Sequence, residues 1–181
     1  TIGEVGPLGA KLQIVNVDKL PTAAVSFGIG ANSSGMWLLR SDGMGYSVIY
    51  DGAGDGVSLQ DLDGDGTPEV VRTWSPFCQS HVASPRLTTV YAFKDGRYVE
   101  ATAEFPQEIA KDASAFNAAI ARANDPSTTP AWKPADQACL HASLALLARE
   151  AGNASEAQAQ TAQAKQLDPS YDLAALEKRA G

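Results

Sequence analysis

The sequence predicts an α+β protein in which an antiparallel, β-rich N-terminal domain (residues 1–105) with blade-like sheets precedes an α-helical C-terminal region (residues 106–181). The composition changes near Pro106: glycine, aspartate, aromatic and β-branched residues are frequent before it, and alanine, glutamine, glutamate, lysine and leucine after it. Before Pro106, short apolar runs are separated by turn residues, whereas after it apolar residues recur at steps of three and four.

The apolar runs before Pro106 define the predicted strands. The clearest pair is Leu87–Phe93 and Tyr98–Thr102, because the Asp95-Gly96 turn between them is the strongest short signal for a β-hairpin. A glycine-rich turn at residues 41–45 joins another pair in the same way. The other predicted strands are Ala10–Val17, Ala23–Ile29, Met36–Arg40, Tyr46–Tyr50, Val57–Leu59 and Glu69–Trp74.

The segment after Pro106 predicts three long helices and a short one. In the first helix, Gln107–Ala123, four apolar residues form a single stripe: Ile109, Ala113, Phe116 and Ile120. The second helix, Ala135–Ala151, ends at Gly152-Asn153, as expected for a left-handed cap. The remaining predicted helices are Ser155–Leu167 and Leu173–Arg179.

Length and composition limit the classes of function. The chain has 181 residues, of which 44% are apolar and 19% charged, so it is globular and long enough for a substantial core. Its net charge of -7 argues against nucleic acid and anionic membranes as partners, because both require a basic surface. No apolar run is long enough for a transmembrane helix. The chain begins with Thr1, so we expect a removed signal segment and an extracytoplasmic location, either periplasmic or secreted, although trimming for expression would look the same.

The two cysteines, Cys78 and Cys139, leave several interpretations open. In an exported protein they can form one disulfide bond. Together with His81 and His141 they could instead form a Cys2His2 zinc site, but Cys139 and His141 are two positions apart on a predicted helix and point in different directions. They could also be two buried thiols, or Cys78 could be a thiol nucleophile with His81 as its base.

The stretch from Asp61 to Val71 is the most informative motif in the chain. It carries carboxylates at alternate positions, glycines between them and a further acid before a run of β-branched residues. In order, these acids and glycines are Asp61, Asp63, Gly64, Asp65, Gly66 and Glu69. Carboxylate oxygens gathered in a tight loop suit a hard divalent cation, with calcium as the natural ligand.

The spacing of this loop matches the first part of an EF-hand loop. Positions one, three, five, seven and nine are Asp61, Asp63, Asp65, Thr67 and Glu69, and a backbone carbonyl coordinates at position seven. The twelfth position, which should be a bidentate glutamate, is Arg72, and a strand follows instead of a helix. The sequence therefore predicts a calcium loop between two strands. The other interpretation is an Asp-Gly turn whose side chains cap their own backbone.

This loop resembles the FG-GAP or VCBS-type repeat of integrin-like β-propellers, in which Asp-x-Asp-Gly-Asp-Gly-x-x-Asp/Glu precedes an apolar strand. The resemblance covers roughly Tyr46 to Trp74. It implies that calcium is the cofactor and that the ligands are Asp61, Asp63, Asp65, the carbonyl of Thr67 and Glu69. A β region of about 100 residues holds about two blade-like units, so a closed propeller is excluded.

The second and third predicted helices resemble a single tetratricopeptide repeat. The matching residues are Leu144, Gly152-Asn153, Glu156-Ala157, Ala164 and Leu167-Asp168-Pro169. The family's bulky positions early in the first helix are His141, Ala145 and Ala148 in this chain. One repeat is too short for a solenoid, so the resemblance implies a helical hairpin that packs against the β domain.

These features predict an exported, calcium-stabilised binding or interaction module whose partner is a protein or another component of the cell envelope. The alternative is an enzyme, a hydrolase with its site between the β domain and the helical region. No catalytic residue is assigned, because the prominent acids all lie in one loop and no nucleophile motif is present.

Overall fold

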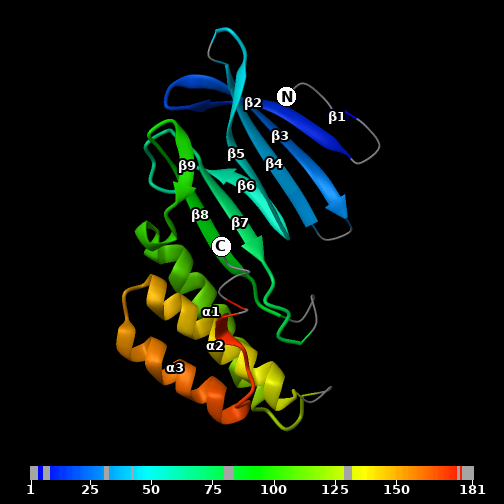
Figure 1. Ribbon diagram of the computed structural model, residues 1–181. Coiled ribbons are helices and arrows are strands. Elements are labelled where there is room, and N and C mark those ends of the chain that lie inside the picture. Colours follow the sequence, from blue (N-terminus) through cyan, green and yellow to red (C-terminus); the bar gives the residue numbers. More distant parts are fainter. Residues whose placement is uncertain are drawn as a thin grey trace. The chain divides into compact units, whose positions relative to one another are not determined.

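The computed structural model describes residues 4–5, 9–30, 33–41, 43–79, 84–128, 132–174 and 176, with strands first and helices after them (Figure 1). The predicted α+β fold class is confirmed. The chain divides into two compact units. The first consists of Thr1–Thr73 and Thr89–Ala101, and the second of Trp74–Thr88 and Thr102–Gly181. The helical unit therefore also includes the segment between the seventh and eighth strands.

The strands form two antiparallel sheets. The five-stranded sheet follows chain order and consists of β1 (Glu4–Val5), β2 (Ala10–Val17), β3 (Leu20–Gly30), β4 (Ser33–Ser41) and β5 (Tyr46–Gly54). The four-stranded sheet consists of β6 (Gly56–Gln60), β7 (Glu69–Trp74), β8 (Leu87–Lys94) and β9 (Arg97–Glu100). Every predicted strand is present, and β1 is an additional strand too short to produce a sequence pattern. In the β8–β9 turn, Asp95 and Gly96 both have positive φ, which confirms the predicted Asp-Gly hairpin.

The core of the first unit lies between its two sheets. Val17, Ala24, Met36 and Leu38 from the five-stranded sheet share one buried cluster with Val70 and Tyr98 from the four-stranded sheet. Aromatic rings add directional contacts, because the ring of Tyr50 lies edge-on to those of Tyr91 at 5.3 Å and Tyr98 at 6.0 Å.

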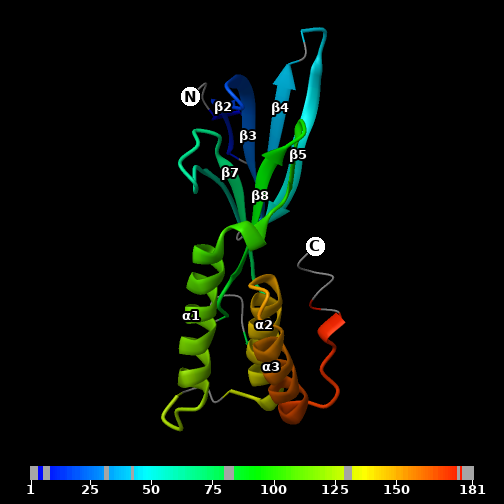
Figure 2. The same cartoon turned by 90° about the vertical axis from the view of Figure 1, so that its left-hand side faces the viewer.

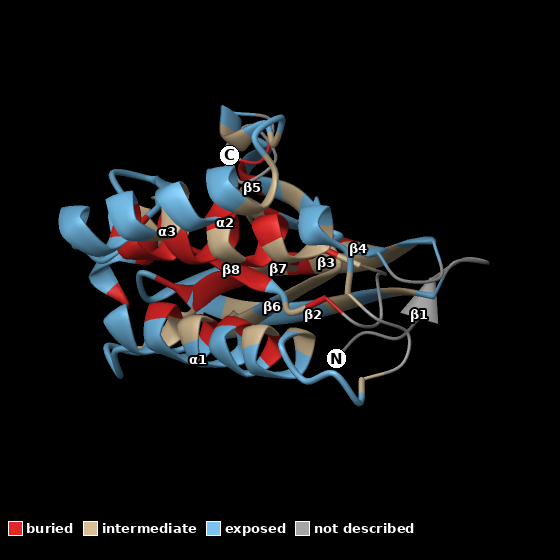
Figure 3. Cartoon of the chain, turned by 90° about the horizontal axis from the view of Figure 1, so that it is seen from below, coloured by how far each residue is buried: buried red, intermediate tan, exposed pale blue. Residues whose placement is uncertain are grey.

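The second unit contains the 3-10 turn η1 (Thr102–Glu104) and the helices α1 (Pro106–Ala123), α2 (Pro134–Glu150) and α3 (Ala154–Leu167), which lie side by side (Figure 2). The buried residues of α1 lie on its side facing α2 (Figure 3). Phe116 is fully buried in this core, and Leu140 and Leu147 of α2 join it there. The three long predicted helices are confirmed, whereas the short helix predicted at Leu173–Arg179 lies mostly outside the described residues.

A two-residue turn ends α2 and starts α3. Gly152 has a φ of 71°, and the amide of Asn153 donates a hydrogen bond to the carbonyl of Ala148 at 2.8 Å, which confirms the predicted left-handed cap. The side chain of Asn153 then accepts a hydrogen bond from the amide of Glu156 at 3.2 Å and caps α3. Further along the pair, Nδ1 of His141 lies 2.6 Å from Oε1 of Gln160. The two helices therefore form a helical hairpin.

Cys78 and Cys139 form a disulfide bond with a Cα–Cα distance of 5.1 Å. Both residues are buried, and the bond ties the segment after β7 to α2 within the second unit. Of the open interpretations, the disulfide is confirmed. The zinc site, the buried thiols and the thiol nucleophile are wrong, because both sulfur atoms are used in the bond; His81 lies outside the described residues. Within the described part of the chain, no helix combines the length and the apolar character needed to cross a membrane.

Candidate metal centre

The acidic loop connects β6 to β7 in the first unit. These strands pair from Gly56 with Thr73 to Gln60 with Glu69, so the ladder holds both ends of the loop in place. The chain turns at Gly64 and Gly66, whose φ values of 79° and 86° lie in the left-handed region that strains most other residues. The alternation of aspartate and glycine therefore folds into a tight loop outside the sheet.

The loop brings three of the predicted ligands together. One carboxylate oxygen from each of Asp61, Asp63 and Asp65 lies within 4.8 Å of the others, and all three side chains are exposed. Two oxygens on opposite sides of one calcium ion are about 5 Å apart, because each Ca–O distance is about 2.4 Å. The three oxygens therefore fit a single calcium coordination shell, and their hard, anionic character suits that ion.

The same carboxylates also accept hydrogen bonds from the loop backbone. Asp61 accepts from the amides of Gly64 at 2.9 Å and Gly66 at 3.1 Å. The Oδ1 atom of Asp63 accepts from the amide of Asp65 at 3.0 Å, and Oδ1 of Asp65 accepts from the amide of Thr67 at 2.6 Å. An ionised carboxylate has about four lone-pair positions, so each aspartate retains acceptor capacity for a cation. The backbone-capping turn and the cation site are therefore compatible in one loop.

Glu69 lies at the base of the loop instead of in the cluster. Its side chain is 3% exposed, and its Oε2 atom accepts a hydrogen bond from the amide of Leu62 at 2.7 Å. Burial raises the pKa of Glu69, and the charges of Asp63 and Asp65 raise it further against the opposing hydrogen bond from Leu62. The ligand roles of Glu69, of the Thr67 carbonyl and of the three clustered aspartates all stay predictions.

Tyr98 of β9 fixes the C-terminal end of the loop. Its hydroxyl donates a hydrogen bond to the carbonyl of Pro68 at 2.7 Å. Burial raises the pKa of the Tyr98 hydroxyl well above its usual range, and the nearby charge of Glu69 adds to the rise. The sequence did not reveal this contact, because 30 residues separate the two partners and only the sheet brings them together.

A polar cavity of about 400 Å³ lies between the acidic loop and the β2–β3 turn. It is lined by Asn16, Asp18, Lys19, Asp65, Gly66 and Thr67. The turn residues Asp18 and Lys19 have φ values of 51° and 62°, so both adopt the left-handed conformation without being glycine. The sequence did not predict this turn, because Asp18 is followed by Lys19 and not by the glycine that usually marks such a turn.

Comparison of the chain with protein-family models, with curated protein sequences and with solved structures found no match. The resemblances to the FG-GAP or VCBS-type repeat and to the tetratricopeptide repeat thus rest on their motif residues and stay predictions.

Proposed function

We propose that this chain is an exported interaction module whose β unit is stabilised by a calcium ion in the acidic loop. The observation that carries this proposal is the convergence of the Asp61, Asp63 and Asp65 carboxylates within 4.8 Å on a loop held by strand pairing. The FG-GAP-like character of the loop and the tetratricopeptide-like character of the α2–α3 hairpin belong to the same proposal, as does a protein or envelope component as partner.

The disulfide bond supports the extracytoplasmic part of the proposal. Structural disulfides persist in oxidising compartments and are rare in the reducing cytosol, and the bond between Cys78 and Cys139 is buried. Calcium is abundant outside the cell, where modules bind it with dissociation constants of about 10⁻⁴–10⁻³ M. The alternative of a hydrolase stays a prediction; Cys78, the thiol considered as its nucleophile, lies in the disulfide.

The role of calcium in this proposal is structural. In water, two unit negative charges at 4.8 Å, the largest separation among these oxygens, repel one another by about 0.9 kcal/mol, and a bound cation replaces this repulsion by attraction. Because the ion binds the folded loop and not the unfolded chain, its binding free energy adds to the free energy of unfolding. At a calcium concentration of about 100 times the dissociation constant, the gain is about 2.7 kcal/mol.

Thermal unfolding with and without calcium tests the proposal. For a chain of this size, a gain of about 2.7 kcal/mol raises the melting temperature by roughly 5–10 °C. We expect this rise in about 10 mM calcium relative to a chelator, a concentration chosen because it is about 100 times a dissociation constant of 10⁻⁴ M. Magnesium should give a smaller rise, because it requires tighter octahedral geometry.

A pair of matched variants assigns the effect to the loop. Asp63→Asn keeps an oxygen acceptor for the Asp65 amide but removes the charge, so it should weaken calcium binding and reduce the calcium-dependent rise. Asp125→Asn is the control, because Asp125 accepts the same type of bond from the amide of Ser127 at 2.8 Å in the second unit, far along the chain from the loop. No rise in the unmodified protein, or an equal rise in Asp63→Asn, contradicts the proposal.

A further inference from the structure

The outward face of the five-stranded sheet is apolar, although its other face already forms the core. Residues paired across antiparallel strands share a face, and Val25 pairs with Leu12 of β2 and Trp37 of β4. The core face carries Ala24 and Leu38, which pair with one another. The strand pairings, with the register shift beside Leu38 taken into account, identify the other residues on the outward face. Its apolar residues include Leu12, Ile14, Pro21, Ala23, Val25, Phe27, Trp37, Leu39, Tyr46, Val48 and Ala53.

Several of these side chains are exposed. Ile14 is 53% exposed, Trp37 43% and Val48 59%. An antiparallel sheet with one face on the core normally presents polar side chains on the other, so an apolar second face indicates a docking surface. We call the outward residues of β2–β5 the outer sheet face.

The aromatic part of the outer sheet face is already ordered. The rings of Phe27 and Trp37 lie 4.7 Å apart, and a Cβ at Gly35 would come within 2.6 Å of the Phe27 ring, so this ring lies directly over Gly35. The Nε1 atom of Trp37 donates a hydrogen bond to Oδ1 of Asp51 at 2.8 Å. Side chains held in this way lose little conformational entropy when a partner binds.

The outer sheet face carries almost no charge, which favours a partner whose surface is also uncharged and apolar. Among the described outward residues of β2–β5, Asp51 is the one charged side chain, and its carboxylate already accepts the Trp37 hydrogen bond. Two copies of a chain with a net charge of -7 repel one another elsewhere, so a face nearly free of charge is where they can approach.

The size of the outer sheet face agrees with a dimer interface. Four strands spaced by about 4.8 Å and about eight residues long, with a rise of about 3.3 Å each, cover roughly 500 Å². Two such faces together bury roughly 1,000 Å² if both are treated as flat, which is about the minimum area for a biological interface and implies a weak dimer.

We infer that the outer sheet face binds the same face of a second copy of this chain. The two five-stranded sheets pack face to face, about 10 Å apart, in a two-fold symmetric dimer. This inference names a partner for the proposed interaction role, and rests on that role, but it does not depend on calcium.

The mass of the full chain in solution tests the dimer. By sedimentation velocity from about 1 µM to about 500 µM, in calcium and in chelator, we expect the mass to rise from 18.9 kDa towards twice that value in both buffers, with a dissociation constant in the micromolar range. Ile14→Lys and Val48→Lys place a charge on the outer sheet face and should weaken the dimer at least tenfold. Both sites are more than half exposed, so both variants should fold, as checked by circular dichroism.

Leu20→Lys is the matched control. Leu20 is 49% exposed in the same sheet but pairs with Val17 of the core face, so this variant should dimerise like the unmodified protein. A protein that stays monomeric at about 500 µM, or a dimer that survives both Ile14→Lys and Val48→Lys, overturns the inference. Monomers that bind phosphatidylcholine vesicles through Ile14 and Val48 would assign the face to lipid and also overturn it. A dimer without a calcium-dependent rise in melting temperature leaves this inference standing and removes only the calcium proposal.

Discussion

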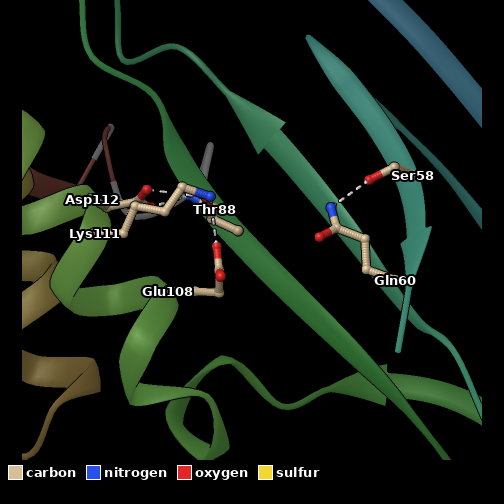
Figure 4. Close-up of polar contacts among 6 residues, drawn as sticks. All are labelled: Ser58, Gln60, Thr88, Glu108, Lys111 and Asp112. Carbon is tan, nitrogen blue, oxygen red and sulfur yellow. Dashed lines mark hydrogen bonds and ion pairs between the residues drawn. The ribbon is translucent and has the colours of Figure 1, made fainter. Parts of the chain in front are cut away.

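Asp112 of α1 is a buried carboxyl group that should make the helical unit sensitive to pH. Its two oxygens accept hydrogen bonds from the amide of Thr88 at 2.6 Å and from the hydroxyl of Thr88 at 3.1 Å (Figure 4). Burial raises the pKa of Asp112 from 3.8 to about 6, against the opposing effect of the two Thr88 hydrogen bonds and the charge of Lys111; the charge of Glu108 adds to the rise.

The sign of the effect follows from the direction of this shift. The folded protein holds the proton of Asp112 more tightly than the unfolded chain does, so this group contributes most to stability below pH 4. The contribution is lost as the pH rises through about 6. A shift from 3.8 to about 6 corresponds to about 3 kcal/mol as an upper limit.

The variant Asp112→Asn isolates this contribution. Asparagine is neutral at every pH, its oxygen can accept the Thr88 amide, and its nitrogen can donate to the Thr88 hydroxyl. We expect the difference in free energy of unfolding between variant and unmodified protein to move in favour of the variant by roughly 1–3 kcal/mol between pH 4 and pH 7. Urea unfolding of both proteins at closely spaced pH values measures this difference. The contributions of the other carboxylates cancel in the difference, because both proteins contain them.

Asp112→Ala provides the control for the hydrogen bonds. It leaves the buried Thr88 amide without its acceptor, so it should have a lower free energy of unfolding than Asp112→Asn by about 1–3 kcal/mol at every pH, because neither variant titrates at this position. A difference between Asp112→Asn and the unmodified protein that is independent of pH, or that moves against the variant as the pH rises, would refute the reasoning.

The remaining predictions concern the disulfide and one turn. Replacing Cys78 and Cys139 by serine opens a loop that spans 61 positions and should lower the free energy of unfolding by about 4 kcal/mol in urea unfolding; a loss below about 1 kcal/mol would contradict the entropic account. Lys19→Gly relieves a left-handed residue in the β2–β3 turn and should raise the free energy of unfolding by about 1 kcal/mol, measured in chelator to exclude calcium effects. Lys19→Ala retains a Cβ and should give no comparable gain, so equal gains in both variants would show that strain is not the cause.

The positions of the elements followed closely from the sequence, because they depend on local patterns. The Asp95-Gly96 turn, the left-handed cap at Gly152 and the apolar stripe that contains Phe116 are each encoded by neighbouring residues. The turn at Asp18-Lys19 was not predicted because Lys19 adopts a left-handed conformation that its side chain does not favour.

Features that depend on pairing between distant segments could not be predicted. Two hydrogen bonds form only in the tertiary fold: the one between Tyr98 and Pro68 and the one between Asp112 and Thr88. The choice between a disulfide and a zinc site for Cys78 also required the tertiary structure. The outer sheet face could not be predicted for a related reason. A strand that is apolar on both faces shows no alternation of apolar and polar residues, so only its pairing in the sheet shows which residues face outward.

In the candidate site, the sequence predicted the three clustered aspartates because alternate loop positions with glycines between them can converge on one point. It did not predict that Glu69 would lie buried at the base of the loop, because that position depends on the pairing of Gln60 with Glu69 and on the amide of Leu62.

The central claim is that the acidic loop binds calcium, and elemental analysis of the protein after dialysis tests it most directly. At about 1 mM free calcium, within the range that extracellular modules bind, we expect up to about one calcium ion per chain above the buffer, and clearly less in Asp63→Asn. A protein without bound calcium, or one that binds the same amount after Asp63→Asn, would contradict the account.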